Sequence, residues 1–104
     1  MPPPSLSAEQ RSAASAKAVL NRRRRAEVKE QLRAGRLSWA QLVDLAHSDE
    51  VVAGLRVQDA LLSMPGVGPQ RLTRFMKSAG VSPSRRLRGL GRHQTAALAE
   101  ILAR

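Results

Sequence analysis

Apolar residues recur along much of this chain at the spacing of α-helices. Val57, Ala60, Leu61 and Met64 follow one another at i, i+3, i+4 and i+7, which places them on one helix face. Three other groups have a similar spacing: Trp39, Leu42, Val43 and Ala46; Leu72, Phe75, Met76 and Ala79; and Leu98, Ile101 and Leu102. No segment sustains the alternation of apolar and polar residues that marks a half-buried strand. The pattern therefore predicts an all-α fold.

The first helix is predicted to be long. Ser7 and Gln10 have the spacing of a capping box, and strong helix formers fill the chain from there to Gly35. A glycine is common just past a helix end, so we expect one helix over residues 7–34. Because the helix has few apolar residues before Val28, its first half is expected to project from the core.

Shorter helices are predicted to follow. Ser38 and Gln41 form a second capping-box pattern, and residues 51–55 read as a short helical turn or a connector. The pair Ser82-Pro83 resembles an N-cap followed by Pro at the first helical position. It predicts a short basic helix over residues 82–88.

The length and the charge distribution narrow the possible partners. At 104 residues the chain has room for one domain. Within it we expect residues 1–36 to form a disordered, proline-rich leader and the long basic helix, and residues 37–104 a helical domain. The formal net charge is +10. Residues 1–36 hold nine basic and three acidic side chains. Residues 37–65 hold one basic and four acidic side chains, and residues 66–104 hold eight basic side chains and one acidic side chain. Two basic regions flanking a near-neutral middle favour a polyanionic partner, nucleic acid first and an acidic membrane surface second.

Several classes of protein are disfavoured by the composition. Trp39 and Phe75 are the only aromatic residues, too few to stack successive bases of a single strand. Without Cys there is no disulfide, thiolate zinc site or Cys nucleophile. His47 and His93 are isolated in the sequence, which disfavours a metal cluster or a catalytic triad. We therefore expect no enzyme, no cofactor and no small-molecule substrate. No apolar run approaches the roughly 18 residues of a membrane span, and no signal-peptide core precedes the first helix.

The segment from Met64 to Pro69 carries the first candidate binding motif. It places Gly66, Val67 and Gly68 between two apolar helices, as in a helix-hairpin-helix. The glycines would permit tight turns and close approach, and Val67 would pack between the helices. Free N–H groups at the start of the second helix would bind phosphate, supported by two basic residues on its solvent face, Arg71 and Arg74. The alternative is a plain corner between two helices.

Two further groups of basic residues are candidate contacts. On the predicted helix over residues 82–88, Leu87 would face the core while Arg85, Arg86 and Arg88 project toward a duplex. On the long helix, a basic stripe covers an arc of about 80° at 100° per residue: Arg11, Arg22, Arg25, Lys29 and Arg33. Arg23 lies outside this stripe and is expected to pair with Glu27. Each group could instead be an ordinary solvated surface.

The sequence resembles the actinobacterial, mycobacterial-type integration host factors. The resemblance lies in residues 9–11, 25–29, 48–51, 61–68 and 85–91, the last stretch being the most specific. It implies a helix-two-turns-helix module and a nucleoid-associated protein that binds double-stranded DNA with little sequence preference. It also implies a cytoplasmic location on the nucleoid, a role in DNA compaction and site-specific integration, and a link to a phage integrase only through DNA. Leu72, where the family usually has a small Ala, and Pro69, in place of a basic residue, depart from the family pattern.

Alternative functions remain open at this point. An RNA-binding protein resembling a small-subunit ribosomal protein would use similar phosphate contacts, although no long basic tail follows the last predicted helix. A glycosylase acting through an N-terminal proline would need a carboxylate beside Pro2, and none is adjacent. A membrane-surface helix would need bulky apolar residues in residues 7–34, and a pure protein adaptor would leave the hairpin motif unexplained. Double-stranded DNA is therefore the expected partner.

Overall fold

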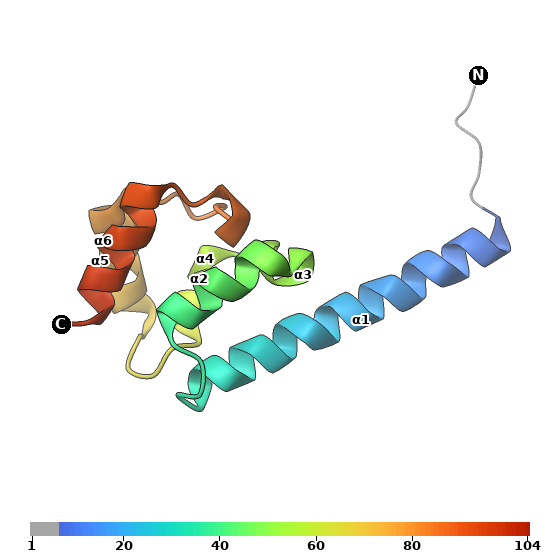
Figure 1. Ribbon diagram of the computed structural model, residues 1–104, viewed down its shortest axis with the longest axis horizontal. Coiled ribbons are helices and arrows are strands. Elements are labelled where there is room, and N and C mark those ends of the chain that lie inside the picture. Colours follow the sequence, from blue (N-terminus) through green and yellow to red (C-terminus); the bar gives the residue numbers. More distant parts are fainter. Residues whose placement is uncertain (1–6) are drawn as a thin grey trace, which may run out of the picture.

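The computed structural model describes residues 7–104, in which helices carry almost all of the regular structure. Within these described residues, six α-helices and one 3₁₀ helix, η1, follow one another (Figure 1): α1 (Ala8–Arg33), α2 (Trp39–Ser48), α3 (Glu50–Ala53), α4 (Val57–Leu62), α5 (Pro69–Ala79), η1 (Leu87–Gly89) and α6 (Arg92–Leu102). The predicted all-α fold is confirmed. The proline-rich leader predicted over residues 2–4 lies outside the described residues.

α1 begins where the sequence predicts. The Ser7 hydroxyl accepts from the Gln10 backbone N–H at 3.1 Å, and the Gln10 side chain accepts from the Ser7 N–H at 2.8 Å. Its buried residues are Val28 and Leu32, so its C-terminal part packs on the body while its N-terminal part projects away (Figure 1). Ser38 and Gln41 cap α2 by the same pair of hydrogen bonds.

The core lies where α1 crosses the shorter helices. α1 packs against α3 and α4, α2 against α3 and α6, and α5 against α4 and α6. The fully buried side chains at the centre come from five of the helices: Val28, Leu32, Leu42, Val52, Val57, Ala60, Leu61 and Leu98. Burial of side chains of this kind is the main favourable contribution to folding.

The helix predicted over residues 82–88 is absent. Residues 83–84 form a turn, Arg86 is extended with φ −101° and ψ 161°, and only Leu87–Gly89 is helical, as a 3₁₀ turn. The backbone N–H of Leu87 donates to the Leu55 carbonyl, and that of Val57 donates to the Arg85 carbonyl, both at 2.9 Å. This antiparallel pairing with a distant segment outweighs the local preference for a helix, and it still buries Leu87 as predicted.

Candidate nucleic-acid interface

Five basic side chains from separate parts of the chain line one hollow beside α1. The hollow has a volume of about 430 Å³. Its charged lining consists of Arg22, Arg25, Lys29, Arg56, Arg86 and a single carboxylate, Asp59. We call this the basic hollow. A concave surface with five cations and one anion concentrates positive potential and attracts phosphate groups.

α1 supplies three of these cations from one face. Arg22, Arg25 and Lys29 are separated by three and four residues, which aligns them along the helix. The burial of Val28 and Leu32 fixes the rotation of α1 and so directs this basic face toward the hollow. Within residues 7–104 the buried Nε of Arg25 has no hydrogen-bond partner. An unpaired buried donor costs free energy.

The pairing between residues 55–57 and 85–87 supplies the other two cations. Arg56 and Arg86 face each other across an isolated antiparallel bridge. The Arg86 guanidinium donates to the Gly54 carbonyl at 2.6 Å. This hydrogen bond fixes the Arg86 side chain against the backbone segment that carries Arg56.

The three arginines of residues 85–88 do not project together as expected. The Arg85 guanidinium bends back to donate to the Gly89 carbonyl at 3.0 Å, and Arg88 lines a different, smaller pocket of about 80 Å³ beside His47. Arg86 alone of the three lines the basic hollow. The prediction of a common basic face was wrong because it assumed a helix, whereas extended backbone sends successive side chains to opposite sides.

The hairpin lies between α4 and α5 as predicted, but only one of its two glycines has a backbone conformation that requires glycine. Gly66 has φ +81°, a left-handed conformation that favours glycine. Gly68 has φ −95° and ψ 177°, which any residue adopts, and a Cβ built there meets no described atom within 4 Å. Val67, predicted to pack between the helices, is only half-buried. The fold therefore needs glycine at position 66, and the open space at Gly68 remains available to a partner.

The start of α5 has the features of an anion site. Pro69 is the first helical residue and no side chain within residues 7–104 caps this end of the helix, so the next N–H groups are free to meet a partner. Arg71 donates to the Gly66 carbonyl at 3.3 Å. Together with Arg74 and Arg104 it lines a second hollow, between α5 and α6, of about 350 Å³. The structure thus places Arg71 and Arg74 in a hollow separate from the basic hollow.

Asp49 links α1 to the start of α3. Its carboxylate accepts from Arg24 Nε at 3.1 Å and from the backbone N–H groups of Val51 and Val52 at 3.0 and 3.2 Å. Desolvation raises the pKa of Asp49, but the hydrogen bonds from Val52, Arg24 and Val51 outweigh it and hold the pKa below its ordinary value. Asp49 therefore stays ionised at neutral pH and neutralises Arg24, which does not line the basic hollow.

Comparison with known proteins identifies the family. A model of the S13-like H2TH domain matches residues 32–102. The integration host factor of Streptomyces coelicolor is 42% identical over 95 residues, which cover 91% of this chain and 89% of that protein. The integration host factor of Mycobacterium tuberculosis is 42% identical over 97 residues, covering 93% and 92%. The chain belongs to the actinobacterial integration host factor family.

A solved structure agrees with this assignment to the integration host factors. The structure of sIHF bound to an 8-base-pair palindromic DNA superposes with a TM-score of 0.78 at 39% sequence identity, covering 82% of this chain and 96% of that chain. The family resemblance and the helix-two-turns-helix fold inferred from the sequence are confirmed.

The structure brings together some of the site residues predicted for this member of the integration host factor family, and it separates others. Arg22, Arg25, Lys29 and Arg86 share the basic hollow, whereas Arg11 and Arg33, also expected on the basic stripe, do not line it. Arg33 instead pairs with Glu30 at 3.3 Å. The expected ion pair between Arg23 and Glu27 was wrong, because Glu27 pairs with Arg24 at 3.6 Å.

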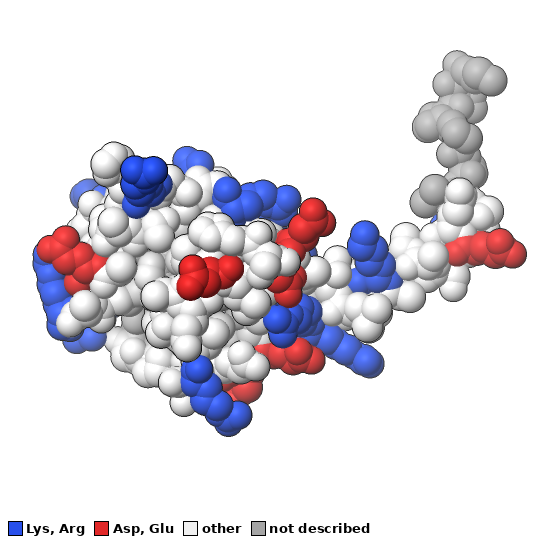
Figure 2. Space-filling view, viewed as in Figure 1, with Lys and Arg blue, Asp and Glu red and all other residues white. Residues whose placement is uncertain are grey.

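Arg56 is the residue that sequence reasoning missed. It is the one basic residue among four acidic ones in residues 37–65, so its local sequence points away from an anion site. Only the long-range pairing with Arg86 places it in the basic hollow. Figure 2 shows one face of the molecule, where basic side chains lie around the edge of the helical body and along α1, with acidic side chains among them and near the centre.

Proposed function

We propose that this protein binds double-stranded DNA as a nucleoid-associated protein, with little dependence on base sequence. The observation that carries the proposal is the convergence of Arg22, Arg25, Lys29, Arg56 and Arg86 on one hollow. Guanidinium and ammonium groups are the usual partners of DNA phosphates, and such contacts give affinity without reading the bases. The DNA-bound structure of sIHF, a similar protein, supports the choice of polymer.

In this proposal several parts of the surface contact the DNA backbone. The basic hollow receives phosphates from one strand, and the first turn of α5, with Gly66, Val67 and Gly68 before it and Arg71 and Arg74 beside it, offers backbone N–H groups to another phosphate. Arg85 and Arg88 contribute positive potential next to the hollow. Binding of this kind organises and compacts DNA.

The cellular role follows from the same contacts. The protein acts on the nucleoid in the cytoplasm, and it supports site-specific integration by shaping DNA, so a phage integrase meets it only through the shared duplex. Within residues 7–104 no helix has the length and apolarity to cross a membrane. No group of three or more His, Asp or Glu side chains that could hold a metal ion occurs in the same residues.

RNA is the second candidate partner, because the matching domain model is described as S13-like. Competition binding separates the two candidates. A labelled DNA duplex is displaced with unlabelled duplex DNA, single-stranded DNA or duplex RNA at one salt concentration. We expect duplex DNA to be the best competitor, and displacement by duplex RNA at lower concentration would overturn the proposal.

Two adjacent arginines on α1 provide a matched test of the basic hollow. Arg22 lines the hollow, whereas Arg23 lies outside it, and both are exposed. Arg22→Gln is expected to weaken duplex binding by roughly threefold to tenfold, typical of one lost hydrogen bond, while Arg23→Gln changes it little. Fluorescence anisotropy with a labelled duplex measures both. Equal losses in the two variants would show that net charge matters and the hollow does not.

A further inference from the structure

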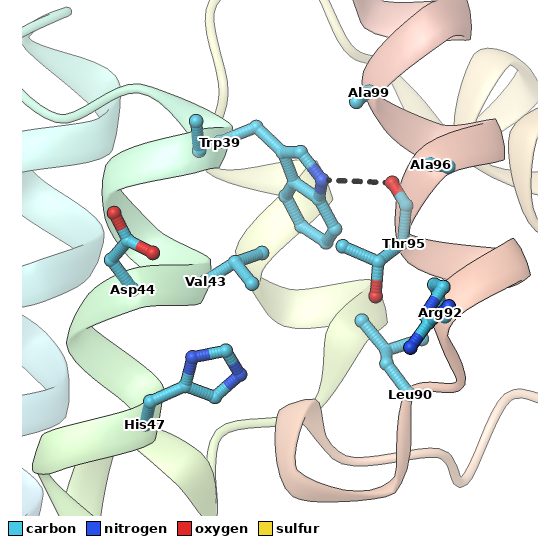
Figure 3. Close-up of a pocket in the computed structure, with 10 residues that line it drawn as sticks. Trp39, Val43, Asp44, His47, Leu90, Arg92, Thr95, Ala96 and Ala99 are labelled. Carbon is cyan, nitrogen blue, oxygen red and sulfur yellow. Dashed lines mark hydrogen bonds between the residues drawn. The ribbon is translucent and has the colours of Figure 1, made fainter.

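An apolar cleft separates α2 from α6, and none of its lining residues belongs to the basic hollow. It has a volume of about 600 Å³, within the range of about 300 to 1,000 Å³ typical of small-molecule sites. Its walls include Trp39 and Val43 from α2 and Ala96 and Ala99 from α6 (Figure 3). The small alanine side chains of α6 leave the space open opposite the indole ring.

The inner wall of the cleft is fixed by the fold. Trp39 is only 5% exposed, and its indole N–H points to the Thr95 carbonyl across the cleft at 3.4 Å (Figure 3). Leu98, which follows Thr95 by three residues on α6, is fully buried. Because both walls are held by core residues, the cleft does not depend on a mobile segment to exist.

Arg92 places a positive charge at one end of this cleft. His47 from α2 and Arg92 from α6 both lie near Leu90 (Figure 3). At this end the cleft shares Val43, His47 and Leu90 with the smaller pocket that Arg88 lines. The one acidic lining residue, Asp44, turns its carboxylate away from Leu90 and Arg92. An apolar body between the helices would therefore have basic groups at one end only.

We propose that this cleft binds a small amphipathic organic anion, a carboxylate or sulfonate on an apolar body. The apolar body lies between Trp39 and the alanines of α6, and the anionic group lies at the Leu90 end, near Arg92 and His47. Burial of the ligand's own apolar body in the cleft supplies most of the affinity, and the basic groups select an anion over a neutral molecule of the same shape. The inference is independent of DNA binding.

The single tryptophan of the chain reports directly on this cleft. Anilinonaphthalene sulfonate is the probe, because its absorption overlaps tryptophan emission and its own emission rises in apolar sites. We expect saturable binding at one probe per chain, with quenching of Trp39 and sensitised emission from the probe. N-phenylnaphthylamine, which has nearly the same apolar body without the sulfonate, is expected to bind several-fold more weakly.

Two variants with matched controls locate the probe. Ala96→Phe fills the cleft from an exposed position and is expected to abolish the energy transfer, whereas Ala16→Phe, exposed on the projecting part of α1, leaves it unchanged. Arg92→Gln is expected to weaken sulfonate binding about threefold to fivefold, the effect of one exposed charge pair, without weakening N-phenylnaphthylamine. Arg36→Gln, an exposed arginine outside the cleft, controls for net charge. Circular dichroism and duplex binding of Ala96→Phe confirm that it folds and still binds DNA.

Four outcomes would overturn the proposal. Unchanged energy transfer in Ala96→Phe would place the probe elsewhere. Equal affinity for the sulfonate and N-phenylnaphthylamine, or no effect of Arg92→Gln, would mean that the charged end selects nothing. Sedimentation of the free protein tests whether a second copy occupies the cleft instead. A dimer that Ala96→Phe dissociates would assign the cleft to self-association.

Discussion

The two glycines of the hairpin differ in what a side chain at each would cost the fold. Gly66 has a left-handed backbone at φ +81°, which a Cβ strains by roughly 1 to 2 kcal/mol. Gly68 is extended and precedes Pro69, a position where β-branched residues are favoured. A substitution at Gly68 therefore tests the approach of a phosphate without disturbing the hairpin.

Gly68→Val is expected to keep the stability of the native protein and to weaken binding of double-stranded DNA. The valine side chain would stand in the space through which a phosphate reaches the first turn of α5. Gly66→Ala is the matched comparison and is expected to lower the free energy of unfolding by about 1 kcal/mol. Urea unfolding and duplex binding measure the two effects. A stable Gly68→Val protein with native affinity would reduce the hairpin to a structural corner.

Asp49 is expected to make the fold sensitive to acid. Its pKa is held below the ordinary value of a carboxyl group, so its stabilising effect is present in full above the unfolded pKa of about 3.9. The effect is lost as the pH falls through the lower, folded pKa. Asp49→Ala removes the cap of α3 and the bond to Arg24, with an expected loss of about 1 kcal/mol at neutral pH. Urea unfolding at pH 7 and below pH 3 measures the free energy of unfolding of both proteins. We expect the difference between the native protein and Asp49→Ala to shrink in acid, and a constant difference would contradict a lowered pKa of Asp49.

At the scale of the elements, the sequence predicts the helix boundaries that depend on contacts between residues close together in the chain. The two capping boxes are formed by residues three apart, and both are confirmed at Ser7 and Ser38. The segment over residues 82–88 fails as a predicted helix because its partner is remote: Arg86 bonds to Gly54, 32 residues away. Nothing within the segment itself encodes that pairing, and a proline after a serine also favours the start of a turn.

Arg86 is expected to stabilise this pairing as well as bind DNA. Arg86→Ala removes the bond to the Gly54 carbonyl, at an expected cost of about 1 kcal/mol, or about 4 °C in Tm for a domain of this size. Arg56 is exposed and has no side-chain hydrogen bond or ion pair within residues 7–104, so Arg56→Ala should leave the Tm unchanged. Both variants are expected to bind the duplex more weakly. Thermal unfolding by circular dichroism distinguishes them, and equal Tm values would contradict the structural role of Arg86.

At the scale of the whole molecule, the fold redistributes charge that the sequence shows only as blocks. Helical geometry aligns Arg22, Arg25 and Lys29 from their spacing alone, and this part of the candidate site was predictable. Tertiary packing brings these side chains together with Arg56 and Arg86. It also places Arg71 and Arg74 in a different hollow. A sequence pattern carries no information about which helix faces meet.

Affinity for double-stranded DNA is expected to fall steeply with salt. Each phosphate neutralised lowers log K by about 0.9 per tenfold rise in salt concentration. Combining Arg22→Gln with Lys29→Gln should reduce that slope by up to about 2 units if both side chains contact phosphate. Titrations over a series of salt concentrations measure it. A lower affinity with an unchanged slope would place the contacts of these two residues outside the DNA interface.

The two backbone hydrogen bonds that join residues 55–57 to residues 85–87 also bear on hydrogen exchange. The amides of Val57 and Leu87 are donors in those bonds, and both residues are buried. Their exchange with solvent should require global unfolding, whereas amides in the projecting half of α1 exchange through local fraying. The basic hollow is lined from the same segments, so it exists only in molecules where these amides are protected. DNA bound there would slow their exchange, because it raises the free energy of unfolding by RT ln(1 + [DNA]/Kd).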